Sequence, residues 1–154
     1  MNTEIERKFI VLNSSYKQLG TSEYCIQGYI RSTKKPFIRI RTIGTQSFLT
    51  MKSNINEISR IEYEYKIPNK DAKELLELFC KNSIIEKYRY KIQYKGTLWE
   101  VDEFLGDNKG LVIAEVELIS ENSIFNKPDW IGKEVSSDKR YYNYNLFKHP
   151  YNKW

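Results

Sequence analysis

The sequence is poor in the residues that build several common kinds of functional site. Its 154 residues include only two cysteines, Cys25 and Cys80, and a single histidine, His149. The cysteines lie far apart and match no metal-ligand spacing, which argues against a zinc site. We expect both to be reduced core residues of a cytoplasmic protein. His149 precedes a proline near the end of the sequence, and we expect it to be a surface or capping residue.

Long apolar runs are also missing. No stretch approaches the roughly 18 residues that a membrane-spanning helix needs, and the sequence is polar from Asn2 onward, so we expect neither a membrane span nor a secretory signal. No phosphate-cradling glycine loop is present, which argues against the common nucleotide-binding folds. Repeats, low-complexity segments and strong linkers are absent too. We therefore expect one domain over residues 1–154.

What the sequence does contain is aromatic and charged. Aromatic residues make up 14%, with 12 tyrosines, which favours a β-rich fold. Charged residues make up 29%, and the formal net charge is +5. A basic protein of this kind favours anionic partners, but net charge alone does not choose among nucleic acid, a membrane surface and a phosphorylated small molecule.

Charged and apolar residues alternate along several segments with the period of two that β-strands show. The alternation is most regular in Ser59–Ile67, and the first segment begins with the pattern Glu4-Ile5-Glu6-Arg7-Lys8-Phe9. Gly44 and the run 106–110 are turn signals that predict hairpins between neighbouring strands. The expected strands are Thr3–Leu12, Glu23–Ser32, Phe37–Thr42, Gln46–Lys52, Ser59–Ile67, Ile84–Tyr94, Leu98–Leu105 and Leu111–Ile119.

Two longer helices are expected. The first is capped by Asn69 or Asp71 and would cover the apolar backs of the strands. The second begins at Ser136 or Ser137 and continues through Phe147, with short helices and loops between it and about residue 120. The apolar stripe of the first helix comprises Ala72, Leu75, Leu76, Phe79 and Cys80.

One face of the expected strands collects charges of both signs. In an open sheet this face would lie in water, whereas about eight antiparallel strands can close into a barrel with the charges inside. Burying unpaired charges is costly, so such a tunnel needs internal neutralisation or a highly charged ligand. A polyphosphate with divalent cations fits, because Lys and Arg bind phosphate oxygens while carboxylates bind hard metal ions. The charged face comprises Glu4, Glu6, Lys8, Arg39, Arg41, Lys52, Glu62, Glu64, Lys87, Arg89, Glu100, Asp102, Glu115 and Glu117.

The pattern Glu4-x-Glu6-x-Lys8 resembles the signature of the CYTH superfamily, also called triphosphate tunnel metalloenzymes. The resemblance covers nearly the whole chain in the right order and is greatest to compact bacterial members. Lys66 is a departure, because members often carry a carboxylate there. The matching segments are Gln27-Gly28-Tyr29, 38–41, 49–52, 60–64, 85–90, 99–102, 114–118, 132–135, Asp138 and 140–143.

The resemblance implies a mainly β, α+β fold: a closed antiparallel barrel of about eight strands, with helices packed outside and a C-terminal helix near one mouth. It also implies Mg²⁺ or Mn²⁺ as cofactor. Lys8 and Tyr29 resemble a catalytic dyad, in which Lys8 lowers the pKa of Tyr29 or helps to place water; a packed wall aromatic is the alternative for Tyr29. The implied phosphate ligands are Lys8, Arg39, Arg41, Lys52, Lys87 and Arg89. The implied metal ligands are Glu4, Glu6 and Glu117, with Glu62, Glu64, Asp102 and Glu115 for a second metal.

The leading functional hypothesis is therefore metal-dependent hydrolysis of a triphosphate, with inorganic tripolyphosphate as the first substrate to test. Adenylyl cyclase and thiamine or nucleoside triphosphatase are alternatives within the superfamily. A non-catalytic polyphosphate-binding module is the alternative outside enzymes, although a polyanion binder gains nothing from so many carboxylates. We expect no nucleic-acid or membrane partner. A homodimer stays open, because a second subunit could cover the apolar outer wall.

Overall fold

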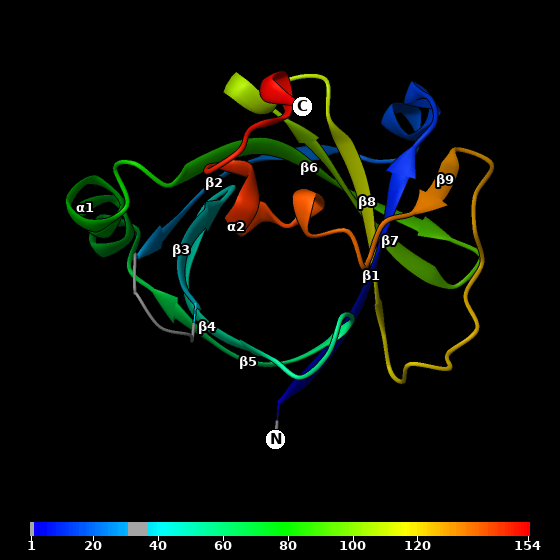
Figure 1. Ribbon diagram of the computed structural model, residues 1–154, viewed down its shortest axis with the longest axis horizontal. Helices are drawn as coiled ribbons and strands as arrows, with labels where there is room; N and C mark the ends of the chain where they lie inside the picture. The colour runs from blue at the N-terminus through cyan, green and yellow to red at the C-terminus, as the bar shows by residue number, and fades with distance from the viewer. Residues whose placement is uncertain (1, 31–36) are drawn as a thin grey trace.

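A computed structural model describes residues 2–30 and 37–154 (Figure 1). Its nine strands form one antiparallel sheet in the order β5-β4-β3-β2-β6-β7-β8-β1-β9, and β5 also pairs with β1. This last pairing closes eight strands into a barrel, as expected, and leaves β9 as an addition to β1. The strands are β1 (Thr3–Val11), β2 (Ser22–Ile30), β3 (Phe37–Ile43), β4 (Gln46–Asn54), β5 (Ser59–Ile67), β6 (Ile84–Tyr94), β7 (Thr97–Phe104), β8 (Val112–Leu118) and β9 (Ile131–Glu134).

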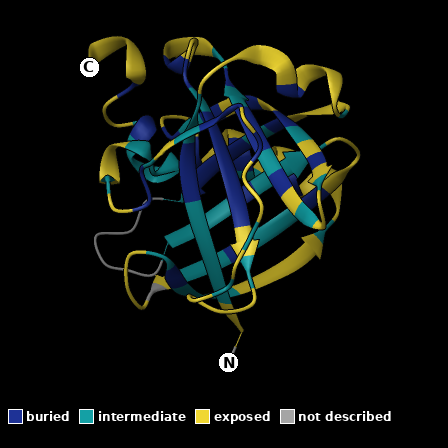
Figure 2. Ribbon diagram, turned by 90° about the vertical axis from the view of Figure 1, so that its right-hand side faces the viewer, coloured by how far each residue is buried: buried dark blue, intermediate teal, exposed yellow. Residues whose placement is uncertain are grey.

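The helices are short apart from α1. They are α1 (Asn69–Phe79) and α2 (Asn143–Leu146), with 3₁₀ turns η1 (Ser14–Gln18), η2 (Gly106–Asn108), η3 (Lys139–Tyr141) and η4 (Tyr151–Lys153). The end of the expected strand Glu23–Ser32 lies outside the described residues. Figure 2 shows that the strands are mostly buried or half-buried, whereas the turns around them are mostly exposed.

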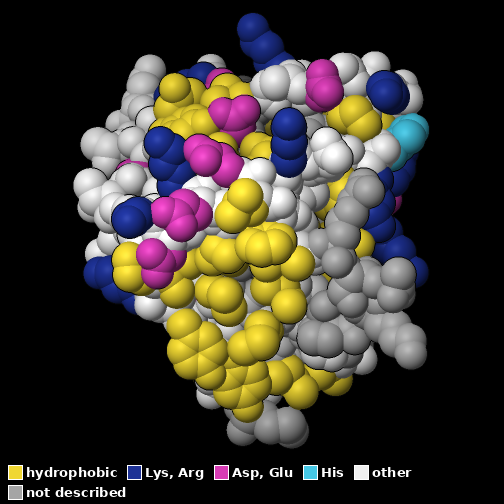
Figure 3. Space-filling model, turned by 90° about the vertical axis from the view of Figure 1, so that its left-hand side faces the viewer, with side chains coloured by type: hydrophobic (Ala, Val, Ile, Leu, Met, Phe, Trp, Pro, Cys, Tyr) yellow, Lys and Arg dark blue, Asp and Glu magenta, His cyan; other side chains and the backbone are white. Residues whose placement is uncertain are grey.

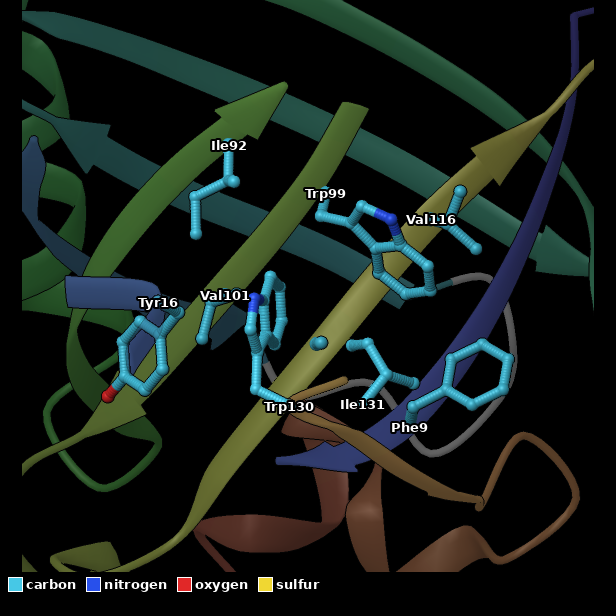
Figure 4. Close-up of a cluster of buried hydrophobic side chains, with 9 residues drawn as sticks. Phe9, Tyr16, Ile92, Trp99, Val101, Val116, Trp130 and Ile131 are labelled. Atoms are coloured by element: carbon cyan, nitrogen blue, oxygen red, sulfur yellow. The ribbon is translucent and has the colours of Figure 1, made fainter. Parts of the chain in front are cut away.

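The main hydrophobic core lies outside the barrel, between the strands and the segment that leads into β9. Phe9 of β1 and Trp99 of β7 are fully buried there, and their rings meet edge to face at 5.5 Å between centroids. Trp130 belongs to the same cluster and lies beside Ile131 (Figure 4). Because successive residues of a strand face opposite sides, packing these apolar residues outward turns their charged neighbours into the barrel.

A second cluster fills one end of the barrel. Ile85, Phe104 and Ile113 share the inward-facing parity of Lys87, Asp102 and Glu115 on the same strands, and they are buried against Leu146 of α2. Helix α2 therefore packs across one mouth, where the resemblance implied a C-terminal helix. The resulting plug gives the interior an apolar end and a charged middle.

Helix α1 covers β2–β4 from outside, where Ala72, Leu76 and Cys80 pack against Ile40. At Gly28 of β2, an added Cβ would lie 2.5 Å from the Cβ of Cys80, so glycine allows this close approach. Hydrophobic side chains gather on this side of the molecule (Figure 3).

Two expectations about α1 were wrong in detail. Phe79 is 57% exposed and does not belong to the buried stripe. Helix α1 has Pro68 at its N-cap position with no side-chain cap, because the Asn69 amide instead accepts a hydrogen bond from Ser47 and donates one to the carbonyl of Thr45. Among the described residues, no helix is long and apolar enough to cross a membrane.

The C-terminal part also differs from the expectation. The single helix through Phe147 is instead η3 and α2, separated by Tyr142, whose backbone is extended at φ −76° and ψ 129°. The Tyr142 hydroxyl donates to the carbonyl of Ser136, which fixes this break. In the region expected to be loops and short helices, β9 pairs with β1 through Phe9–Glu134 and Val11–Ile131.

Candidate active site

The barrel encloses a cavity of about 1160 Å³ with a charged lining. Its described lining has as many carboxylates as cationic side chains. The cationic groups are Lys8, Arg39, Arg41, Lys52, Arg60, Lys87, Arg89, Lys91 and Lys139, and the carboxylates are Glu4, Glu6, Glu23, Glu57, Glu62, Glu64, Glu100, Glu115 and Glu117. The lining is thus close to neutral, so a polyanion would need positive charge beyond what the walls supply.

The structure brings the predicted site residues together. All of them line the cavity except Asp102, which is completely buried behind Lys87 and Arg89. Tyr29 lies in the wall as well, stacked on Phe147 and edge to face with Tyr144. Lys66, the departure from the family pattern, is exposed at the end of β5 and is not part of the lining.

Inside the cavity, the carboxylates on β1 and β5 are bound by cations of the same walls. Lys52 Nζ lies 2.9 Å from Glu4 Oε2 and also contacts the Glu62 carboxylate. Arg60 reaches both β1 carboxylates, at 3.4 Å from Glu4 and 3.5 Å from Glu6. These pairs satisfy the charges as long as no other ion competes for them.

Strand β3 supplies two guanidinium groups. Arg41 Nη2 donates to Glu64 Oε2 at 3.0 Å, and Arg39 Nη2 approaches the same oxygen at 3.3 Å. The Nε–H groups of both arginines are buried and have no hydrogen-bond partner in the described structure. A buried donor without an acceptor is unfavourable, so both groups are available to an anionic ligand.

Lys8 lies at the centre of the β1 wall and is 5% exposed. Its ammonium group donates to the carboxylates of Glu6 and Glu115. Burial lowers the pKa of Lys8, but the two carboxylates raise it by more, so the pKa lies above its ordinary value. Lys8 is therefore a positively charged donor at neutral pH.

Lys8 lowers the pKa of Tyr29, as the resemblance implied, but burial raises it by more. Burial raises the pKa of Tyr29 to about 12, and the positive charges of Arg39 and Lys8 offset only part of that rise. Gln27 donates a hydrogen bond of 3.0 Å to the Tyr29 hydroxyl. The phenol is consequently neutral and can donate a hydrogen bond, but it is a poor base.

Glu6 and Glu117 are directly opposed on the neighbouring strands β1 and β8. Like charges in this position repel each other. Glu117 forms no ion pair among the described residues, and its pKa is raised by burial and then by the nearby carboxylates Glu4 and Glu6. This end of the cavity has the excess negative charge that a cation would relieve.

Comparison with known proteins assigns the chain to a family. The CYTH domain model matches residues 2–146. The chain belongs to the CYTH family. It is 53% identical over 151 residues to a protein of Acetivibrio thermocellus named inorganic triphosphatase, covering 98% of this chain and 97% of the relative.

A second curated protein and a solved structure carry the same name. An inorganic triphosphatase of Nitrosomonas europaea is 39% identical over 145 residues, covering 92% of this chain and 94% of the relative. A solved structure described as an inorganic triphosphatase superposes with a TM-score of 0.69 at 36% identity and covers 95% of both chains. The family resemblance inferred from the motifs is thereby confirmed.

CYTH tunnel enzymes generally depend on a divalent metal, and the donor set here is of the right kind. Carboxylate oxygens are the ligands that Mg²⁺ and Mn²⁺ prefer. Among the described residues, however, no three His, Cys, Asp or Glu side chains are arranged to hold an ion as they stand. The pairs of Glu4 and Glu6 with Lys52, Lys8 and Arg60 explain why, because these cations occupy the carboxylates.

The family-based assignment of roles left out three residues that contact the predicted site. Glu100 already stands on the charged face predicted from the alternation, and Arg60 follows the same alternation as Glu62, so strand parity places both inside the barrel. Asn143 could not have been found this way, because it reaches the site from α2. Its side-chain oxygen accepts a hydrogen bond of 3.1 Å from Lys87 Nζ.

Proposed function

We propose that this CYTH protein hydrolyses inorganic tripolyphosphate to phosphate and diphosphate with the help of Mg²⁺ or Mn²⁺. The observation that carries the proposal is the barrel cavity, whose lining has equal numbers of cations and carboxylates, many of them paired with one another. Its relatives at 53% and 39% identity, both named inorganic triphosphatase, support the same conclusion.

The phosphate ligands we propose are Lys8, Arg39, Arg41, Lys52, Lys87 and Arg89. In Arg39 and Arg41, the unpartnered buried Nε–H groups supply donors without breaking an existing bond. Lys52 and Lys8 would exchange a carboxylate for a phosphate oxygen, which is also a charge-assisted hydrogen bond. The hydrogen bonds to phosphate therefore largely offset the cost of breaking the ion pairs of Lys52 and Lys8 with the carboxylates.

The carboxylates released in this exchange are the metal ligands we propose. Glu4, Glu6 and Glu117 would hold the ion that contacts the triphosphate, and Glu62, Glu64 and Glu115 would serve a second ion or its water. When bound, a divalent ion supplies positive charge that stabilises the charge developing on the transferred phosphoryl group. Because the empty lining is close to neutral, the ion and the triphosphate bind more favourably together than either does alone.

In the reaction, the oxygen of a water molecule forms a bond to a terminal phosphorus as the bridging P–O bond to diphosphate breaks. Lys8 remains protonated and donates hydrogen bonds to phosphate oxygens, stabilising the negative charge. Tyr29 remains a neutral phenol because its pKa is raised to about 12. Its hydroxyl orients a phosphate oxygen or the water by donating a hydrogen bond. Catalysis thus rests on positioning and charge stabilisation.

The test is phosphate release from tripolyphosphate, ATP and thiamine triphosphate, each with Mg²⁺, with Mn²⁺ and with a chelator. We expect metal-dependent release, fastest from tripolyphosphate. The variant Glu6→Gln should abolish most of it, and Glu77→Gln on the exposed side of α1 should leave it unchanged. Absence of metal-dependent turnover of every triphosphate would refute the proposal, and formation of cyclic AMP from ATP would replace it by a cyclase.

A further inference from the structure

Asp102 is surrounded by two of the proposed phosphate ligands. Arg89 lies directly opposite it on β6, with Nε 2.7 Å from Oδ1 and Nη2 2.7 Å from Oδ2. Lys87 Nζ lies 2.6 Å from Oδ2. Both carboxylate oxygens are thus used by cations, and the side chain is 1% exposed.

This environment differs from that of the other carboxylates of the site. Glu100 and Glu115 also accept hydrogen bonds from Arg89, but both line the cavity and can turn toward a ligand. Asp102 does not line the cavity. A metal ion would have to compete with Arg89 and Lys87 for its oxygens, and displacing these cations would leave them buried without their partner, at high cost.

The bonds of Arg89 show what Asp102 contributes. Four of the five N–H groups of this guanidinium face carboxylates, two of them on Asp102. Lys87 is held between Asp102 and the Asn143 side chain on α2. One carboxylate therefore fixes the direction of two cations and neutralises only one of their charges.

From this geometry we infer that Asp102 is a positioning residue that holds Lys87 and Arg89 toward the triphosphate, and that it is not a metal ligand. The inference rests on the proposed function, because it assigns those two cations to phosphate binding. It changes the role expected from the family pattern, in which Asp102 stands among the metal carboxylates. Without the Asp102 carboxylate, Lys87 and Arg89 would turn toward Glu115 and Glu100 and away from the triphosphate.

The test separates phosphate binding from metal binding without relying on turnover. Calorimetry with tripolyphosphate in the presence of chelator measures the affinity for the triphosphate alone. The paramagnetic resonance signal of free Mn²⁺ measures the affinity for the metal without substrate. For Asp102→Asn we expect tripolyphosphate affinity to fall about 10- to 100-fold, by analogy with the loss when a partner that orients a metal ligand is removed, with Mn²⁺ affinity unchanged. For Glu117→Gln we expect the reverse. Glu103→Gln, a neighbour that faces outward toward Lys17, should change neither.

Either of two results would overturn the inference: Mn²⁺ affinity falling in Asp102→Asn as it does in Glu117→Gln, or tripolyphosphate affinity unchanged in Asp102→Asn. If Asp102→Asn does not fold, the wild-type protein crystallised with Mn²⁺ decides. A metal peak within about 2.0–2.6 Å of an Asp102 oxygen, the range of metal–carboxylate bonds, refutes the positioning role, and an intact Arg89–Asp102 pair beside a bound ion supports it. Both measurements remain informative if no triphosphate is hydrolysed.

Discussion

Replacing Glu117 by glutamine should change stability in opposite directions with and without metal. Glu117 faces Glu6 across β1 and β8 and has no ion-pair partner among the described residues. Without metal, Glu117→Gln removes a repulsion between opposed like charges, which is worth roughly 0.2–1 kcal/mol. For a domain of this size, 1 kcal/mol corresponds to about 2–4 °C in Tm, so the variant should melt roughly 0.4–4 °C higher in chelator.

The pKa direction gives the same sign. The folded state raises the pKa of Glu117, so it binds that proton more tightly than the unfolded chain does. The ionised carboxylate consequently destabilises the fold at neutral pH; this loss shrinks as the pH falls through the folded pKa and is gone below the pKa of the unfolded chain. The advantage of Glu117→Gln in chelator should therefore shrink toward acid pH.

With metal, the wild type should instead be more stable than Glu117→Gln. At a Mn²⁺ concentration of 100 times its Kd, binding stabilises the wild type by about 2.7 kcal/mol. If loss of the ligand weakens binding about 100-fold, the same concentration stabilises the variant by only about 0.4 kcal/mol. Thermal melts of both proteins in chelator and in Mn²⁺ test this crossing. A variant that melts lower in chelator, or that gains as much from Mn²⁺ as the wild type, would refute the assignment of Glu117.

Three further predictions follow from the same structure. Tyr29→Phe should reduce kcat less than about 10-fold and leave the dependence of kcat on pH unchanged from pH 7 to 10, because the Tyr29 pKa of about 12 keeps its proton in place. If kcat of the wild type changes with pH in this range and kcat of the variant does not, the prediction is wrong. Trp99→Ala should cost about 3–5 kcal/mol of unfolding free energy in urea titration, since Trp99 is fully buried, and a cost below 1 kcal/mol would mean that the core is elsewhere. Burial raises the pKa of Glu115, but Lys8 and neighbouring cations lower it well below its ordinary 4.5, so its stabilisation should persist above pH 4.5 and vanish as the pH falls through the folded pKa; Glu115→Gln should flatten that acid limb.

The alternation of residues predicted most of the barrel and its lining. It works because a strand has a period of two, so Ile5, Arg7 and Phe9 on one side place Glu4, Glu6 and Lys8 on the other. Burial of the apolar side outside the barrel then determines which charges face inward. The same parity identifies Arg60 and Glu100, which the motif-based assignment left out.

Other features depend on contacts that no local pattern records. Strand β9 has four residues and exists because the free edge of β1 is next to it. The expected C-terminal helix is broken at Tyr142, where a tertiary hydrogen bond to Ser136 favours extended backbone over helix. The position of Asp102 behind the cations also requires three-dimensional geometry, since its strand parity equals that of the cavity-lining Glu100.

The pairing of β1 with β5 closes the barrel, and its stability determines how firmly Glu4 is held. Only Thr3–Ile5 pair with Ser59–Ile61 there, whereas β4 and β5 pair along Ser47–Asn54. This short seam has the fewest backbone bonds to break, so it should be the first part of the wall to exchange its amide hydrogens. Glu4 lies within it. Opening of this seam would therefore displace a proposed metal ligand before the rest of the barrel loosens, and an ion bound there would hold the two strands together.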